Sequence, residues 1–201
     1  MTWIETVAYG DSEDELRVLY DRIKGPDDNV DNIMLAHSLR PHTMQGHMTL
    51  YKYVLHHPRN SLPKAYLEAI GVYVSSLNKC AYCVEHHFAG MARLLNDAER
   101  SDAIRQALQH RQPENVFEGA ELAGLQYAGK LTLAAAELTE TDIESLREAG
   151  LDDGQILEIN QVTAYFSYAN RTVLGLGVSA AGDIIGLSPG DSQNPDNWSH
   201  A

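Results

Sequence analysis

The chain has 201 residues, a length that suits one globular domain with a single hydrophobic core. Hydrophobic residues make up 44% of the chain and charged residues 21%, which excludes a wholly disordered or fibrous protein. Its 28 acidic residues outnumber 15 basic ones and give a formal net charge of −13. This balance argues against nucleic acid and anionic membranes as partners, because both require a basic surface.

Apolar residues recur at intervals of three and four along most of the chain, which predicts an all-α fold. The expected helices are, in chain order, residues 12–24, 42–56, 63–77, 80–95, 97–109, 116–136 and 141–150, and one that begins after Asp152. We expect a single-domain helical bundle. Its predicted parts are an N-terminal helical segment over 1–59, a core over 60–182 and a polar C-terminal tail over 183–201. The tail is expected to be mobile in isolation or to pack on another subunit.

No apolar run approaches the roughly 20 residues that a membrane span requires. The N-terminal stretch carries acidic residues where a signal peptide would carry basic ones. The sequence therefore predicts a cytoplasmic protein.

Both cysteines lie in one tetrapeptide, Cys80-Ala81-Tyr82-Cys83. Two cysteines cannot form a disulfide scaffold, and a C-x-x-C pair in a reducing compartment is usually catalytic or metal-binding. Cys83 follows Cys80 by three residues and precedes His87 by four, so we expect the three side chains to share one stripe of a helix. This arrangement would let a thiol exchange protons with an imidazole.

Glu68 joins this group if the chain reverses near Asn78. In one continuous helix Glu68 would lie roughly 18 Å from Cys80, too far for contact. If two antiparallel helices meet at Asn78, Glu68 lies ten residues before the turn and His87 nine residues after it. We therefore expect a carboxylate, an imidazole and two thiols to converge on one helix pair.

These groups suit thiol-based redox chemistry. A thiolate is the nucleophile, and a helix N-terminus or a nearby imidazolium lowers the pKa of the thiol. His87 could accept the thiol proton while Glu68 orients the imidazole. The second cysteine could trap a sulfenic acid as a disulfide. The set predicts a thiol peroxidase or a disulfide reductase.

The pattern Glu-x11-Cys-x-x-Cys-x3-His resembles the signature of the alkylhydroperoxidase D-like proteins, within the carboxymuconolactone decarboxylase superfamily. The stretch 77–83 followed by two histidines is most similar to the branch of uncharacterised peroxidase-related enzymes. Residues 138–178 are similar to the family's C-terminal helices, including the Asn170-Arg171 pair. The resemblance covers about residues 60–180.

The resemblance implies an all-α fold assembled into trimers or hexamers, with no bound prosthetic group. It also implies reduction of a hydroperoxide and regeneration by an external dithiol, such as a lipoylated protein. One position departs from the pattern: the alkylhydroperoxidase D enzymes carry a second histidine just before the latter cysteine, where this chain has Tyr82. One member of the family's proton relay is therefore replaced.

The order in which the two thiols react is open to two interpretations. The helix dipole favours Cys80 as the attacking thiol, because it lies nearer the helix N-terminus. The imidazole four residues on favours Cys83, and the family resemblance agrees. We expect Cys83 to attack the peroxide, and Cys80 to resolve the sulfenic acid and meet the external reductant.

Several further residues have both a functional and a purely structural interpretation. Tyr73 and Tyr82 could line the pocket or simply pack, and His86 could be a relay member, a surface residue or a subunit contact. A zinc site would need about four ligands, and the segment around the two cysteines offers three. The remaining histidines follow no ligand spacing, so a solvated or capping role is expected for His37, His42, His47, His56 and His57.

The sequence thus predicts a thiol-dependent peroxidase that reduces hydrogen peroxide or organic hydroperoxides through a Cys80–Cys83 disulfide cycle, with Glu68 and His87 as proton relay. One alternative is a carboxymuconolactone decarboxylase-like enzyme, which has no use for a redox pair. Another is a redox-sensing oligomer without catalysis, which would need the same low-pKa thiols. A stable homo-oligomer is expected in each case.

Overall fold

The computed structural model describes residues 2–190, 193–194 and 197–198, and within them the fold is all-α, as predicted. None of the described helices is long and apolar enough to cross a membrane. The helices are α1 (Asp14–Ile23), α2 (Asn32–Leu35), α3 (Pro41–Leu55), α4 (Lys64–Leu77), α5 (Ala81–Leu95), α6 (Ala98–Gln109), α7 (Gly119–Leu133), α8 (Glu140–Glu148) and α9 (Asp153–Leu176).

Wherever a helix was predicted, its boundaries agree with the structure to within three residues. Helix α8 begins at Glu140, one residue earlier than predicted, because Thr139 caps it and Asp142 closes the capping box. Helix α2 has four residues, too few for a periodic pattern, and was not predicted. The predicted helix over 116–136 is α7, which begins only at Gly119.

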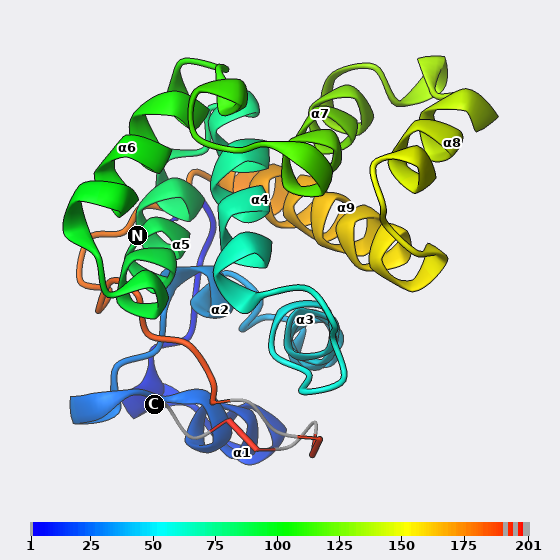
Figure 1. The fold of residues 1–201 in the computed structure, drawn as a ribbon. Helices are drawn as coiled ribbons and strands as arrows, with labels where there is room; N and C mark the ends of the chain where they lie inside the picture. The colour runs from blue at the N-terminus through cyan, green and yellow to red at the C-terminus, as the bar shows by residue number, and fades with distance from the viewer. Residues whose placement is uncertain (1, 191–192, 195–196, 199–201) are drawn as a thin grey trace.

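Helix α4 lies at the centre of the bundle and packs against α5, α6, α7 and α9 (Figure 1). Its side chains are buried on nearly every face, which explains why the segment is apolar all round. At Gly71 an added Cβ would lie 2.3 Å from the ring of Phe166, so glycine is needed for α9 to approach this closely. The core therefore holds α4 and α9 in one fixed packing.

Helices α4 and α5 form the antiparallel pair that the sequence predicted. The chain reverses at Lys79, which adopts a left-handed conformation with φ of 59°. The turn is closed by a hydrogen bond of 2.8 Å from the Cys80 backbone N–H to the Ser75 carbonyl oxygen. This turn places α5 alongside α4, so that the residues after Cys80 lie next to those around Glu68.

After α9 the chain returns across α5 towards the N-terminal helices (Figure 1). We call residues 178–190 the return segment. Asn32 holds it in place, because the side-chain amide of Asn32 donates to the carbonyl oxygens of Ser179 and Ala181 at 2.8 and 3.0 Å. Arg93 of α5 donates to the carbonyl oxygen of Gly186 at 2.6 Å. The described residues of the predicted polar tail thus pack on the core of their own chain.

Candidate functional site

The two cysteines are free thiols in different local structures. Cys80 is the N-cap residue of α5, with φ of −94° and ψ of 88°, whereas Cys83 lies in the first helical turn. The prediction that Cys80 shares a helical stripe with Cys83 and His87 is therefore wrong, since Cys80 precedes the helix. Both side chains are buried, with 0% and 3% of their surface exposed.

The two thiols also differ in acidity. The pKa of Cys80 is lowered because its sulfur accepts hydrogen bonds from the Cys83 thiol, the Cys83 backbone N–H and Asn170. The pKa of Cys83 is raised well above its usual value, because the thiol donates to Cys80 and is buried. The first negative charge of the pair therefore forms on Cys80, and Cys83 keeps its proton.

Asn170 of α9 is a site residue that the sequence analysis noted only as part of the Asn170-Arg171 pair. Its amide donates to the Ser75 hydroxyl at 3.0 Å, and its oxygen accepts from the Asn78 amide at 3.0 Å. It is fully buried and also bonds to both thiols. A signal was present in the sequence, since a polar asparagine interrupts the apolar stripe of α9 between Phe166 and Val173.

Glu158 of α9 has a structural role. Its carboxylate accepts from the backbone N–H groups of Ser61 and Leu62 at 2.7 and 2.9 Å. It thus ties α9 to the segment that enters α4, at a distance from the thiols.

Glu68 and His87 meet as predicted. Oε2 of Glu68 lies 2.7 Å from Nδ1 of His87, and the carboxylate is 1% exposed. The imidazole also packs edge-on against Phe166, with ring centroids 4.5 Å apart. A carboxylate on Nδ1 fixes that nitrogen as the donor and leaves Nε2 free to accept a proton. The pair is therefore built as an oriented base.

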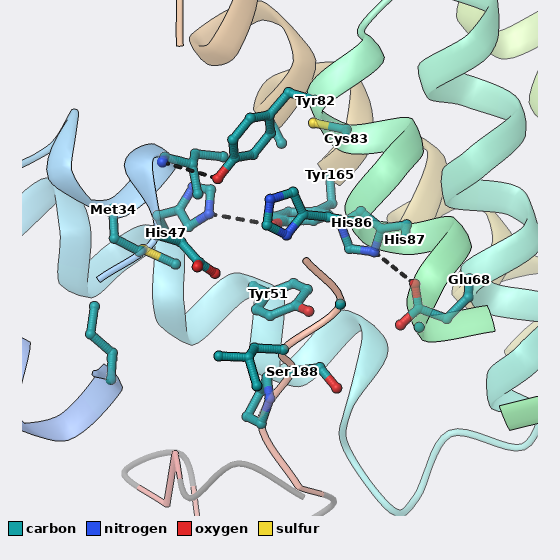
Figure 2. A pocket seen from close by; sticks show the side chains of 18 of the residues that line it. Met34, His47, Tyr51, Glu68, Tyr82, Cys83, His86, His87, Tyr165 and Ser188 are labelled. Carbon is teal, nitrogen blue, oxygen red and sulfur yellow. Dashed lines mark hydrogen bonds and ion pairs between the residues drawn. The ribbon is translucent and has the colours of Figure 1, made fainter. Parts of the chain in front are cut away.

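Cys83, Glu68 and His87 line one cavity (Figure 2). The empty space of the cavity, including the solvent in its open mouth, is about 750 Å³. Its other walls come from α1, α2, α3, α5, α9 and the chain that follows α9. They include His47, Tyr51, Tyr82, His86, Tyr165, Ser188 and Trp198.

Cys80 faces a different and more open cavity. That cavity is lined by residues of the α4–α5 turn and by neighbouring side chains, among them Ser76, Lys79, Glu85 and Gln109. The two sulfurs are thus hydrogen-bonded to each other while each faces its own cavity. This geometry separates access to Cys83 from access to Cys80.

Tyr82 and His86 lie on the cavity wall beside Cys83 and share a carboxylate. The Tyr82 hydroxyl donates to Oδ2 of Asp183 at 2.7 Å, and Nε2 of His86 lies 3.4 Å from the same oxygen. The two rings are stacked with centroids 4.5 Å apart. Asp183 was not predicted, because it lies about a hundred residues away in a segment without helical periodicity.

The remaining candidates occupy other places. Tyr73 does not line the cavity of Cys83; its ring packs against α7, where a Cβ at Gly129 would lie 3.3 Å away. The expected solvated or capping role is wrong for His47, which is 2% exposed in the middle of α3. His56 is 1% exposed and is the C-cap residue of α3. Burial, helped by nearby His37, lowers the pKa of His47 to about 3, so this ring is neutral. Among the described residues no group of His, Cys, Asp and Glu is arranged to hold a metal ion.

Residues 41–130 match the model of the carboxymuconolactone decarboxylase family. The match runs from the start of α3 into α7, so it includes the Glu68–His87 pair and both cysteines. It begins earlier and ends earlier than the resemblance noted in the sequence. No curated protein matches the chain.

Several solved structures share the fold over most of its length. A peroxidase-related protein with an alkylhydroperoxidase AhpD core from Ralstonia eutropha JMP134 is 23% identical, with a TM-score of 0.76, and the alignment covers 89% of this chain and 92% of that chain. A peroxidase-related protein from Silicibacter sp. TM1040 is 26% identical, with a TM-score of 0.76 and coverage of 89% and 91%. The debrominase Bmp8 is 19% identical, with a TM-score of 0.67 and coverage of 89% and 90%.

The family match and the shared fold agree with the Glu-x11-Cys-x-x-Cys-x3-His pattern and with its observed geometry. The chain therefore belongs to the alkylhydroperoxidase D-like/carboxymuconolactone decarboxylase superfamily.

Proposed function

We propose that this protein is a thiol-dependent peroxidase that reduces hydrogen peroxide or a small organic hydroperoxide. The observation that carries the proposal is that Cys83 and the Glu68–His87 pair line one cavity. A second free thiol, that of Cys80, is hydrogen-bonded to Cys83. Family membership suggests peroxidase-like or decarboxylase-like chemistry. The buried thiol pair favours the former, because decarboxylation has no use for it.

Cys83 is the proposed attacking residue because, of the two cysteines, it is the one that lines the cavity with His87. Its raised pKa does not prevent this role. When the proton in the S–H···S⁻ bond moves from Cys83 to Cys80, the negative charge moves to Cys83. His87, oriented by Glu68, offers a second acceptor for that proton.

The proposed cycle transfers two electrons. The Cys83 thiolate attacks the outer peroxide oxygen, so that an S–O bond forms, the O–O bond breaks and an alkoxide or hydroxide leaves with a proton. Cys80 then attacks the Cys83 sulfenic acid and the disulfide forms, while the Cys80 thiol proton and the departing hydroxide leave together as water. An external dithiol reduces the disulfide and is itself oxidised.

We further propose that the external dithiol, for example a lipoyl group, reacts at Cys80. Cys80 lines the more open second cavity, which supports this assignment. Because the Cys80 side chain is 0% exposed, its sulfur must become accessible before it exchanges with a dithiol. Assembly into a homo-oligomer, a trimer or hexamer, is also proposed, as is a cytoplasmic location. Exposed aromatic side chains such as Trp3, 79% exposed, support assembly.

Peroxide consumption with an excess of dihydrolipoamide tests the proposal. The wild-type protein should turn over repeatedly, whereas a redox sensor would consume about one equivalent per chain. Cys83→Ser should abolish consumption, and Cys80→Ser should stop after a sulfenic acid that oxidises further. A Cys83→Ser protein that retains most of the activity would refute the assignment.

A further inference from the structure

His86 and His87 are consecutive on α5, yet their ring nitrogens meet different carboxylates. Nδ1 of His87 lies 2.7 Å from Glu68, and Nε2 of His86 lies 3.4 Å from Asp183. Both imidazoles line the cavity that Cys83 lines (Figure 2). The cavity therefore holds two carboxylate-supported imidazoles beside one thiol, and the Glu68–His87 pair accounts for one of them.

Asp183 is held so that its charge faces His86. Its side chain is 2% exposed, and its carboxylate accepts the Asn32 backbone N–H at 3.0 Å and the Tyr82 hydroxyl at 2.7 Å. This carboxylate lies 3.4 Å from Nε2 of His86, within the distance of an ion pair when the ring carries a proton. Because Nε2 faces Asp183, Nδ1 of His86 is the ring nitrogen available to a molecule in the cavity.

Tyr82 cannot serve in place of His86. Its hydroxyl donates to Asp183 and accepts the Ile33 backbone N–H at 3.2 Å, so its donor is already in use. Burial, reinforced by the Asp183 charge, raises the pKa of Tyr82 well above its usual value. The ring instead stacks on the His86 imidazole and holds it in place.

Reduction of a hydroperoxide makes two opposite demands on proton transfer. The Cys83 thiol must lose a proton, for which the Glu68–His87 pair is oriented. The leaving oxygen must gain one, because an alkoxide is a strong base and leaves slowly as an anion. A single imidazole can meet both demands only in sequence, by taking the thiol proton and then giving it to the leaving oxygen. A second imidazole that is already protonated would let the two transfers occur in one step.

We propose, on the basis of the proposed peroxidase function, that His86 is the general acid that protonates the leaving oxygen and that Asp183 positions it. The Cys83 sulfur forms a bond to the outer oxygen and is oxidised to the sulfenic acid. The O–O bond breaks, and the inner oxygen takes the proton of the His86 imidazolium and departs as an alcohol or water. His86 is left neutral and regains a proton from solvent.

The dependence of the rate on the leaving group tests this role. Reduced protein is mixed with tert-butyl hydroperoxide, which releases an alkoxide, or with peracetic acid, which releases the stable acetate anion. Oxidation of the thiols is followed in a single turnover, so no external reductant is needed, and the rate of Cys83→Ser is subtracted as background. In His86→Gln the rate with tert-butyl hydroperoxide should fall about 10²-fold or more, while the rate with peracetic acid should stay nearly constant.

Three further variants separate proton donation from packing. His86→Phe keeps the ring on Tyr82 without a proton to donate, so it should show the same selective loss. Asp183→Asn should show a smaller loss of the same kind, again with peracetic acid spared. His42→Gln replaces an exposed histidine on α3 and should leave both rates unchanged.

Each outcome bears on a defined claim. An equal fall with both peroxides in His86→Gln and His86→Phe would overturn the inference, because it indicates damage to the cavity. An unchanged rate with tert-butyl hydroperoxide would also overturn it. If His86→Gln does not fold, the ratio of the two rates in His86→Phe decides. A wild-type protein whose thiols react with neither peroxide would refute the proposed function itself.

Discussion

The cavity has two walls that are built in different ways. The first wall, Glu68 and His87, comes from two helices joined by a tight turn, and its partners lie 19 residues apart. The second wall, Tyr82 and His86 supported by Asp183, joins α5 to the return segment across 101 residues. The same kind of pair, imidazole and carboxylate, thus arises once from a local hairpin and once from a distant loop.

The difference bears on rigidity as well as on origin. Glu68 lies on a helix buried on nearly every face, so the first wall opens only if the core opens. The return segment has no helix of its own and is held by side-chain bonds from Asn32 and Arg93. Loops held in this way open at a lower free energy than core helices. The second wall is therefore the part of the cavity that can change without unfolding.

The largest effect is expected at the first wall. His87→Ala and Glu68→Gln should each lower the rate of thiol oxidation by peroxide by about 10²- to 10⁴-fold, the range for loss of a general base. The double variant should be no slower than the slower single variant, because the two residues act as a unit. Single-turnover kinetics would check this, with the exposed histidine His110→Gln as control. Additive losses would show that the residues act separately.

Acidity of the thiol pair offers the next test. Because the Cys83 thiol lowers the pKa of Cys80 by donating to it, Cys83→Ala should raise the pKa of Cys80. The midpoint of the alkylation rate against pH should move to higher pH, so alkylation near pH 7 should slow. Cys83→Ser keeps a hydroxyl donor and should shift the midpoint less. An unmoved midpoint in Cys83→Ala would contradict the hydrogen bond between the thiols.

Loosening the second wall should have a smaller and local effect. Asn32→Ala removes donors to two carbonyl oxygens of the return segment and should cost roughly 1–3 kcal/mol of local stability. Amide hydrogen exchange should speed up over 178–190 while α4 and α5 keep their protection. Equal acceleration in α4 would mean that the two walls are not independent.

The smallest effect is expected far from both walls. Thr139→Ala removes the N-cap of α8 and should lower the free energy of unfolding by about 1 kcal/mol. Helix α8 lines neither cavity, so the rate of thiol oxidation should not change. Urea denaturation and single-turnover kinetics on the same sample measure both. A loss of activity here would show that stability, and not the walls, controls the reaction.

The sequence by itself determined the helices, the α4–α5 hairpin and the first wall. These features depend on spacing, because apolar residues at threes and fours define buried faces. The counts from Glu68 and from His87 to the turn then place both at one height on an antiparallel pair. Glu68 and His87 could be predicted as partners because they lie on consecutive helices joined by one short turn.

Tertiary structure alone decided the rest. Cys80 does not lie on the helical stripe of Cys83 and His87, because the left-handed turn at Lys79 makes it the N-cap residue of α5. Asn170 lies beside the thiols because α9 packs on α4. Asp183 lies beside His86 because the chain folds back after α9. No spacing rule encodes such contacts, since they depend on how separate elements pack and not on positions along one helix.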